Sequence, residues 1–236
     1  EYKRWVEILG VSSIGSINRM VLDGNGDELI KIGEALQEKK VGQIADEIAL
    51  HREKVRMVLI SGPSSSGKTT FAKKLAIQLK VAALTPVTIS LDNYFVDREK
   101  TPLDENGQYD FESIYALDIE AFNQDLLSLF SGKEIDMPKF SFENGKRFYD
   151  GTKLKIDEKN ILLIEGIHAL NPLLTHLVAD DKKFKVYVSA LTSLSVDGHN
   201  RIPTTDNRLI RRIIRDYRYR GYSALDTISR WQSVRS

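Results

Sequence analysis

The stretch "VLISGPSSSGKTTFAKKL", from Val58 to Leu75, decides the fold class of this sequence. An apolar run leads into a glycine-rich loop, and a helical pattern follows with Phe71, Leu75 and Leu79 on one face. Within the stretch, "GPSSSGKT" matches the phosphate-loop pattern G-x-x-x-x-G-K-[ST] in the strand, loop and helix context that the pattern requires. The sequence therefore predicts a P-loop fold that binds a nucleotide.

Each loop position has a physical use. Gly62 and Gly67 permit backbone angles and a close approach that a Cβ atom would block. The N–H groups of the loop and of the first helical turn form an anion-binding nest, and the helix dipole strengthens it. Lys68 adds a positive charge for the β- and γ-phosphates, and the Thr69 hydroxyl can bind Mg²⁺. We expect the phosphates of ATP or GTP to contact the residues Gly62, Pro63, Ser64, Ser65, Ser66, Gly67, Lys68, Thr69 and Thr70.

Further along the chain, "PVTISLD", "NILLIEG" and "FKVYVSA" are apolar runs of strand length. Helical patterns separate them, such as "IYALDIEAFNQDLLSLFSG", which Gly132 closes. This alternation predicts an α/β protein with a doubly wound parallel sheet and helices on both faces. Because the apolar runs are continuous, the strands should be buried on both sides.

Two segments depart from this rhythm. "MPKFSFENGKRFYDGTKLKID" contains the pair Asn144 and Gly145, which predicts an inserted β-hairpin that projects over a site. Residues 1–50 carry apolar residues at helical spacing, and Gly42 should separate two helices. We expect residues 1–50 to be a helical appendage or the tail of a preceding domain, and residues 51–236 to be the P-loop domain.

The amino-acid composition argues against several classes of protein, among them disulfide-linked and membrane-spanning proteins. The formal net charge is +1, which does not indicate an overall basic field for nucleic acid. The absence of cysteine excludes disulfides and thiolate metal sites, and it fits a reducing cytoplasm. No apolar run reaches the roughly 18 residues of a membrane-spanning helix. We expect a cytoplasmic protein without a membrane or nucleic-acid partner, and a homo-oligomer stays open.

Two acidic residues follow predicted strands, Asp92 in "TISLDNYF" and Glu165 in "LLIEGIHAL". Ligands of such sheets bind beyond the carboxyl ends of the strands. One carboxylate there can accept the proton of an acceptor hydroxyl, and the other can orient Mg²⁺. Either residue alone would also fit an N-cap or a turn, but the pair indicates phosphoryl transfer.

The segment "NRIPTTDNRLIRRIIRDYRYRG" holds seven arginines and no lysine. Its apolar residues follow helical spacing and predict an amphipathic helix that Asp206 caps. A solvated face and a nucleic-acid-binding helix are alternatives to a lid over the transferring phosphates. The phosphate loop favours the lid, because guanidinium groups bind phosphate through several donors.

In this order, "SGPSSSGKTT", "SLDNYF", "LLIEGIHAL" and "DNRLIRRIIRDYRYRG" resemble the uridine kinase and phosphoribulokinase family of P-loop kinases. The resemblance covers about Val55 to Arg235. It implies transfer of the γ-phosphoryl group of Mg-ATP to a hydroxyl of a small molecule such as uridine or cytidine. It makes Asp92 the base, and it makes three lid residues the phosphate clamp, namely Arg211, Arg212 and Arg215. Around the acceptor it implies Asp92, Tyr94, Asp110, Phe140 and Arg208. Thr69 and Glu165 would hold the metal.

The sequence departs from the family in the hairpin. Uridine kinases carry a Tyr and a His there that read the pyrimidine, and this chain has Phe140 and Gly145 instead. The stacking face is retained, but the polar groups are not. Two alternatives follow: a kinase for another acceptor, such as a sugar phosphate or a pantothenate-like alcohol, and a nucleotide-sensing or RNA-linked binding protein. Asp92 argues against the second, because a binding protein needs no base there.

The ends of the chain also differ from the minimal kinase. Residues 1–50 are similar to larger fused proteins, in which such a kinase follows a region that resembles the N-terminal part of threonyl-tRNA synthetase. The family continues beyond the last residue of this chain with another strand and helix. We therefore expect the kinase domain to be truncated at its C-terminus.

Overall fold

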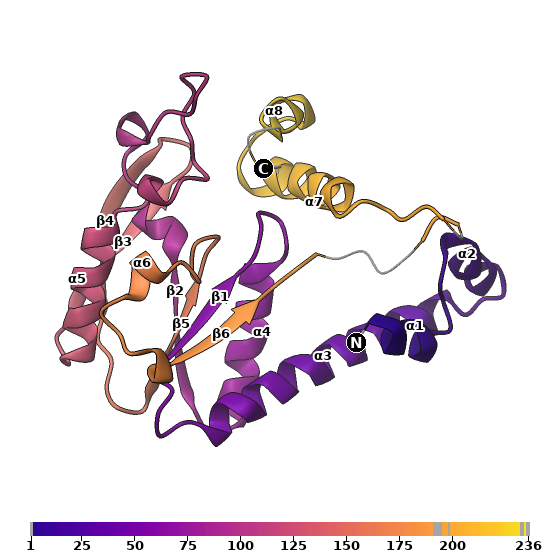
Figure 1. Cartoon of the computed structure of the whole chain (residues 1–236), viewed down its shortest axis with the longest axis horizontal. Helices are drawn as coiled ribbons and strands as arrows, with labels where there is room; N and C mark the ends of the chain where they lie inside the picture. Colours follow the sequence, from indigo (N-terminus) through magenta and orange to yellow (C-terminus); the bar gives the residue numbers. More distant parts are fainter. Residues whose placement is uncertain (1, 191–194, 198, 232–233, 235–236) are drawn as a thin grey trace.

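The structure is a computed structural model that describes residues 2–190, 195–197, 199–231 and 234. A parallel sheet in the order β2-β5-β1-β6 forms its centre (Figure 1). Its strands are β1 (Met57–Ser61), β2 (Thr85–Ser90), β5 (Asn160–Glu165) and β6 (Lys183–Tyr187). The α-helices are α1 (Tyr2–Leu9), α2 (Ile14–Leu22), α3 (Gly26–Leu50), α4 (Lys68–Val81), α5 (Ile119–Phe130), α6 (Pro172–Thr175), α7 (Thr204–Tyr219) and α8 (Ala224–Ser229). Short 3₁₀ helices span Leu91–Tyr94, Arg98–Lys100, Ile114–Ala116 and Asp180–Lys182.

Each face of the sheet carries its own hydrophobic core, because successive side chains of a strand point in opposite directions. Met57 and Leu59 of β1 pack into the core that α5 and α6 cover. Val58 and Ile60 pack into the core that α3 and α4 cover. The α/β prediction with helices on both faces is confirmed. The expected burial holds for the central strands β1 and β5, whereas β2 and β6 at the sheet edges are partly exposed.

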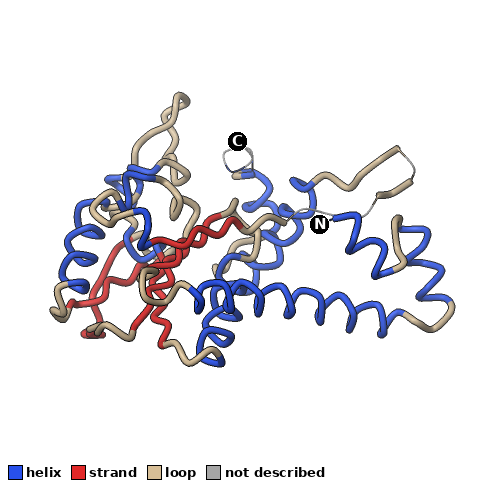
Figure 2. Tube along the Cα trace, turned by 60° about the horizontal axis from the view of Figure 1, so that its bottom comes forward, coloured by secondary structure: helices blue, strands red, loops and turns tan. Residues whose placement is uncertain are grey.

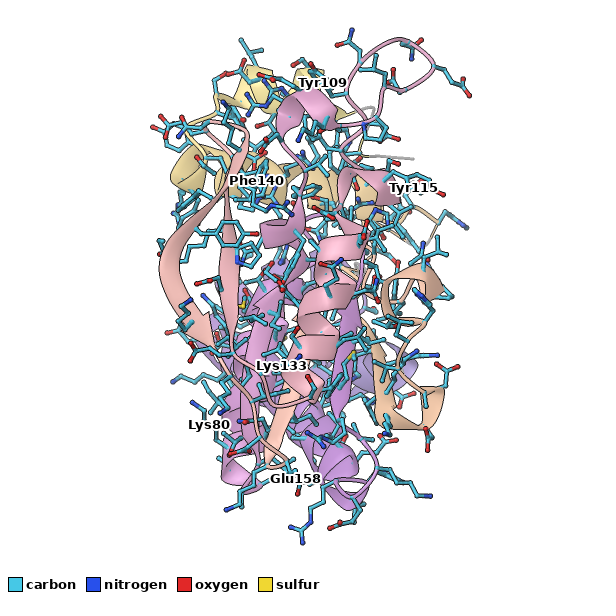
Figure 3. The ribbon with its side chains drawn as sticks, turned by 90° about the vertical axis from the view of Figure 1, so that its left-hand side faces the viewer. Lys80, Tyr109, Tyr115, Lys133, Phe140 and Glu158 are labelled. Carbon is cyan, nitrogen blue, oxygen red and sulfur yellow. The ribbon has the colours of Figure 1, made fainter. Side chains whose placement is uncertain are left out.

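The predicted hairpin is present as β3 (Ile135–Ser141) and β4 (Lys146–Leu154), which pair antiparallel. Gly145 ends the turn at a φ of +66°, a backbone conformation that glycine adopts readily. In Figure 3, Phe140 of this hairpin lies toward the same end of the molecule as Tyr109. That end faces the carboxyl ends of the parallel strands, so the hairpin borders the region where a ligand of this fold binds.

The N-terminal region contains α1, α2 and the long α3, which extends well beyond the sheet (Figure 2). The prediction that Gly42 separates two helices is wrong, because α3 runs without a break from Gly26 to Leu50. Gly42 instead faces α4, where an added Cβ would lie 3.7 Å from Gln78 Oε1. This is an ordinary van der Waals distance, so a small side chain would also fit between α3 and α4 at this position. No helix in the described part of the chain is long and apolar enough to cross a membrane.

The arginine-rich segment forms α7, but two details differ from the sequence prediction. Pro203 is the N-cap residue, and Asp206 lies inside the first turn. The apolar stripe points outward, since Ile214 is 49% and Tyr217 is 74% exposed. The buried residues of α7 are Arg208 and Asp216. This helix therefore turns its charged face toward the phosphate loop.

Candidate active site

The phosphate loop lies between β1 and α4, where glycines are required at both ends. At Gly62, an added Cβ would lie 2.0 Å from the carbonyl oxygen of Val188 on the chain beyond β6. Gly67 is the N-cap residue of α4 and has a φ of +102°. Any side chain at either position would displace the loop from its strand or strain its backbone.

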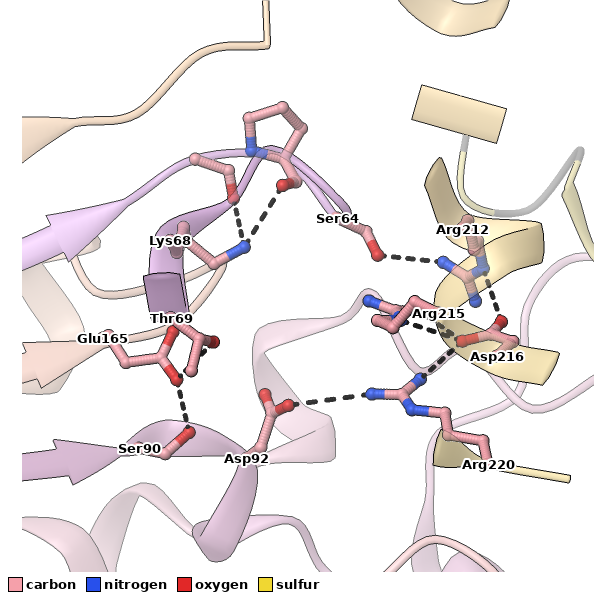
Figure 4. A network of polar contacts seen from close by, with 12 residues as sticks. Ser64, Lys68, Thr69, Ser90, Asp92, Glu165, Arg212, Arg215, Asp216 and Arg220 are labelled. Carbon is pink, nitrogen blue, oxygen red and sulfur yellow. Dashed lines mark hydrogen bonds and ion pairs between the residues drawn. The ribbon is translucent and has the colours of Figure 1, made fainter. Parts of the chain in front are cut away.

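Lys68 folds back onto this loop. Its Nζ donates hydrogen bonds to the carbonyl oxygens of Gly62 at 2.9 Å and Pro63 at 3.2 Å (Figure 4). Burial lowers the pKa of the Lys68 ammonium, although the carboxylate of Glu165 opposes that shift. The buried hydroxyls of Ser65 and Ser66 have no hydrogen-bond partner among the described residues. Phosphate oxygens are strong hydrogen-bond acceptors, so a chain of phosphate groups fits the Lys68 ammonium and the two serine hydroxyls.

Thr69, Ser90 and Glu165 meet at the ends of α4, β2 and β5. The hydroxyls of Thr69 and Ser90 donate to the same Glu165 oxygen, Oε1, at 3.1 and 2.9 Å. Burial, and then the nearby Asp92, raises the pKa of the Glu165 carboxyl. No cluster of three His, Cys, Asp or Glu residues that could hold a metal occurs in the described residues. One hydroxyl and one carboxylate do fit Mg²⁺, which takes its other ligands from water and phosphate.

The predicted lid lies directly on the phosphate loop. Arg211 Nε donates to the Ser65 carbonyl oxygen at 3.0 Å, and Arg212 Nη1 donates to Ser64 Oγ at 3.0 Å. Figure 4 shows Arg212 and Arg215 reaching from α7 toward the loop. The structure thus brings the lid arginines and the loop together around the position of a phosphate tail.

Arg208 was expected to reach the acceptor, and the structure corrects this. Its guanidinium is buried, donates to the carbonyl oxygens of Ser64 at 3.0 Å and Val234 at 3.3 Å, and lies over the Trp231 ring. Its hydrogen bonds thus join the lid to the phosphate loop. Arg208 lies on the buried face of α7, so its side chain points into the protein.

Asp216 is a functional candidate that the sequence reasoning missed. Its side chain is almost fully buried and lies 2.8 Å from Arg215 Nη2, 3.4 Å from Arg212 Nε and 3.8 Å from Arg220 Nη1. This one carboxylate therefore orients three guanidinium groups. The signal in the sequence was a single acidic residue within a run of arginines, at helical spacing from Arg212 and Arg220.

One open cavity of about 2040 Å³ joins the phosphate loop to the hairpin. Asp92 lines it just after β2, and its side chain is 43% exposed. Arg220 Nη2 lies 4.0 Å from Asp92 Oδ2 (Figure 4). Asp92 and Glu165 thus line the same cavity as the phosphate loop, and their expected tasks as base and metal ligand stay predictions.

Tyr94 was expected at the acceptor, but it belongs to the core. The side chain is 1% exposed, its hydroxyl donates to Asp125 Oδ2 at 2.9 Å, and its ring packs edge-on against Phe122. Burial raises the pKa of the Tyr94 hydroxyl well above its usual range. The 3₁₀ turn after β2 directs Phe95, and not Tyr94, into the cavity.

Asp110 lines the cavity, but its carboxylate has a local structural task. Oδ1 accepts hydrogen bonds from the backbone N–H groups of Glu112 at 3.0 Å and Ser113 at 3.1 Å. Glu112 also lines the cavity, and burial raises its pKa while Arg212 and Lys68 oppose that rise. Among the two carboxylates, Glu112 is the one whose side chain is free of protein hydrogen bonds within the described residues. The sequence prediction chose the neighbouring acid two positions earlier.

Phe140 lines the cavity as part of an aromatic wall with Phe95 and Phe142, and its expected contact with the acceptor stays a prediction. Its ring centroid is 5.5 Å from that of Phe95 and 5.3 Å from that of Phe142. The guanidinium carbon of Arg220 lies 4.0 Å from the centre of the Phe142 ring. The ring planes are inclined to one another by 55° to 77°, so the rings form an apolar wall on which a flat group can stack against one ring face at a time.

Comparisons with a family model and with individual proteins point to the same family of kinases. The model of the family described as "Phosphoribulokinase / Uridine kinase family" matches residues 57–236. A uridine kinase of Schizosaccharomyces pombe is 30% identical over 180 residues, which cover 75% of this chain and 35% of that protein. A uridine kinase of Halalkalibacterium halodurans is 26% identical over 175 residues, which cover 74% of each chain. This chain thus spans about a third of the first relative and about three quarters of the second.

A solved structure is similar in fold. A candidate fructose transport system kinase from Silicibacter sp. TM1040 aligns with a TM-score of 0.55 and 15% sequence identity. The alignment covers 82% of this chain and 89% of that chain. At this low identity the likeness concerns the fold alone, and it agrees with the parallel sheet and phosphate loop described above.

Proposed function

The chain belongs to the phosphoribulokinase and uridine kinase family, and we propose that it is a Mg-ATP-dependent kinase whose acceptor is a nucleoside hydroxyl, uridine-like or cytidine-like. The observation that carries the proposal is the single cavity in which the phosphate loop, Asp92 and the lid arginines meet. The relatives named uridine kinases support a nucleoside as the acceptor.

Mg-ATP supplies the phosphoryl group and a compensating positive charge when it is bound. The loop amides and Lys68 would hold the β- and γ-phosphates, and Thr69 with Glu165 would hold the metal. Lys68 now donates to loop carbonyls, so its ammonium exchanges these hydrogen bonds for phosphate oxygens when the nucleotide enters. The buried Ser65 and Ser66 hydroxyls gain partners at the same time.

The groups that carry out the transfer lie at the carboxyl ends of the parallel strands and on α7. Asp92 accepts the proton of the acceptor hydroxyl as the oxygen attacks phosphorus. Arg211, Arg212 and Arg215 stabilise the negative charge of the moving phosphoryl group, because such transfer depends on positioning and electrostatics. Glu112 is placed to accept hydrogen bonds from the sugar hydroxyls, and the aromatic wall is placed to stack the base.

We also propose a division of the chain. Residues 51–236 form the kinase domain, and residues 1–50 form a helical appendage to it. The hydrogen bonds of Glu38 with Lys74 and Gln78 attach the appendage to α4, and the second half of α3 shares the core of the kinase domain through Val41, Ala45 and Ile48.

An acceptor screen tests the proposed activity. The chain is incubated with γ-labelled ATP and Mg²⁺ and offered uridine, cytidine, purine nucleosides, ribose phosphates and pantothenate, with the Asp92→Asn variant as the blank. We expect label on a pyrimidine nucleoside. If only a sugar phosphate is labelled, the acceptor is a sugar phosphate and not a nucleoside. ATP binding without any labelled acceptor would contradict the kinase activity and favour a nucleotide-sensing protein.

A further inference from the structure

A second guanidinium on the acceptor side is not explained by phosphoryl transfer. Arg98 lies in the 3₁₀ turn that follows Asp92 and lines the same cavity. Its Nη2 donates to the carbonyl oxygen of Phe142 at 2.7 Å. It makes no ion pair with any described residue, so its positive charge is not neutralised by the protein around it.

The hairpin turn holds Arg98 in place. The Arg98 N–H donates to the carbonyl oxygen of Gly145 at 2.8 Å, and a Cβ added at Gly145 would lie 2.6 Å from Arg98 Nε. The arginine side chain thus occupies the space above the glycine, where any larger residue would push it away. Because both ends of the side chain are fixed, the guanidinium is preorganised at the rim of the cavity.

The position of Arg98 relative to the aromatic wall suggests its task. Its hydrogen bond to Phe142 places the guanidinium at the border of the wall that Phe95, Phe140 and Phe142 form. Arg220 also lies against this wall, 4.0 Å from the centre of the Phe142 ring, and its Nη2 lies 4.0 Å from Asp92 Oδ2. A flat group held against the wall would therefore lie beside Arg98, while Arg220 links the same wall to Asp92.

A guanidinium only donates hydrogen bonds, so it selects ligand atoms that accept them. The edge of a pyrimidine base offers carbonyl oxygens, and that of cytosine also offers an unprotonated ring nitrogen. We propose that Arg98 determines acceptor specificity by donating hydrogen bonds to these accepting atoms of a pyrimidine stacked on the aromatic wall. The inference rests on the proposed function and names the residue that reads the base.

Another arginine of the hairpin shows what a purely structural guanidinium looks like here. Arg147 Nη2 pairs with Asp118 Oδ2 at 2.8 Å, and its backbone N–H donates to Asp97. Its side chain does not line the cavity. The ion-paired Arg147 of the hairpin therefore provides a control for the unpaired Arg98 of the adjacent 3₁₀ turn.

Isothermal titration calorimetry tests the proposal with the full chain and no turnover. Cytidine, uridine, ribose and ribose 5-phosphate are titrated into the wild type, Arg98→Gln and Arg147→Gln, and the melting temperature of each protein is recorded. We expect Arg98→Gln to weaken both nucleosides roughly 10- to 100-fold, the loss of a hydrogen bond to a charged group. Ribose, which has no base, should bind the wild type and Arg98→Gln equally. Arg147→Gln should lower the melting temperature and leave the nucleoside Kd unchanged.

Several results would overturn the assignment. Unchanged nucleoside Kd values in Arg98→Gln, or an equal loss for ribose, would make Arg98 only a clamp of the hairpin. A loss confined to ribose 5-phosphate would make it a reader of an anionic group. If the wild type binds nucleosides but transfers no phosphate to them, the proposed function fails while the binding comparison still decides the role of Arg98.

Discussion

The nucleotide side and the acceptor side of the cavity are built in different ways. On the nucleotide side, nine consecutive residues supply the loop, and its backbone N–H groups are the expected phosphate donors. On the acceptor side, the lining side chains come from the turn after β2, the segment around Glu112 and the β3–β4 hairpin. A site that is contiguous in sequence is specified by a local sequence pattern. A site dispersed over several segments depends on the direction in which each turn points its side chains.

Among the changes on one side of the cavity alone, the largest expected effect tests the contiguous side. Lys68→Ala should weaken ATP binding and reduce kcat/KM for ATP by about 10²–10³-fold, because the loop loses its charge for the β- and γ-phosphates. Nucleotide binding by calorimetry and steady-state kinetics measure both effects. Binding of ATP as tight as in the wild type would contradict the assignment of the phosphate loop.

The next effect separates two neighbouring carboxylates on the dispersed side. Glu112→Gln should raise the KM of the acceptor roughly 10-fold or more, because a charged hydrogen-bond acceptor is removed from the cavity. Asp110→Asn should chiefly lower the melting temperature, since Asp110 holds the backbone of residues 112 and 113. Steady-state kinetics of both variants show which carboxylate binds the acceptor. A larger rise in the acceptor KM for Asp110→Asn than for Glu112→Gln would favour Asp110, the residue predicted from sequence.

A pH-dependent effect tests the boundary between the two sides. Burial raises the pKa of Glu165, so the folded protein holds this proton more tightly than the unfolded chain does. The stability that protonation provides is therefore complete at acidic pH and is lost as the pH rises through the raised pKa. Without Mg²⁺, Glu165→Gln should melt a few degrees above the wild type at alkaline pH and level with it at acidic pH. A melting difference that does not change with pH would contradict the raised pKa.

The smallest effect concerns Tyr94, which the structure moves from the acceptor side into the core. Tyr94→Phe should lower the free energy of unfolding by about 1 kcal/mol, since the hydrogen bond to Asp125 is lost. Chemical denaturation measures this change. The acceptor KM should stay at the wild-type value, and a clear rise in it would place Tyr94 back at the site.

The sequence specifies the sheet, the loop and the hairpin because each rests on a local pattern. The positions of Asp92 and Glu165 are also predictable, since both lie at the carboxyl ends of apolar strands, β2 and β5. Tyr94 and Phe95 are adjacent, however, and only the 3₁₀ turn determines which of them faces the cavity. Arg208 and Arg212 share one helix, and the packing of α7 decides that the first is buried in the protein. Such orientations depend on tertiary contacts that periodicity does not encode.

The central claim is that both sides of the cavity act in one phosphoryl transfer, with Asp92 between them. The most direct test is to measure, for Asp92→Asn, the ATP dissociation constant and the rate of transfer to the nucleoside found in the acceptor screen. The account predicts an ATP affinity within several-fold of the wild type and a kcat about 10²–10⁴-fold lower, the range of general-base catalysis. An unchanged kcat would remove Asp92 from the mechanism and contradict the account.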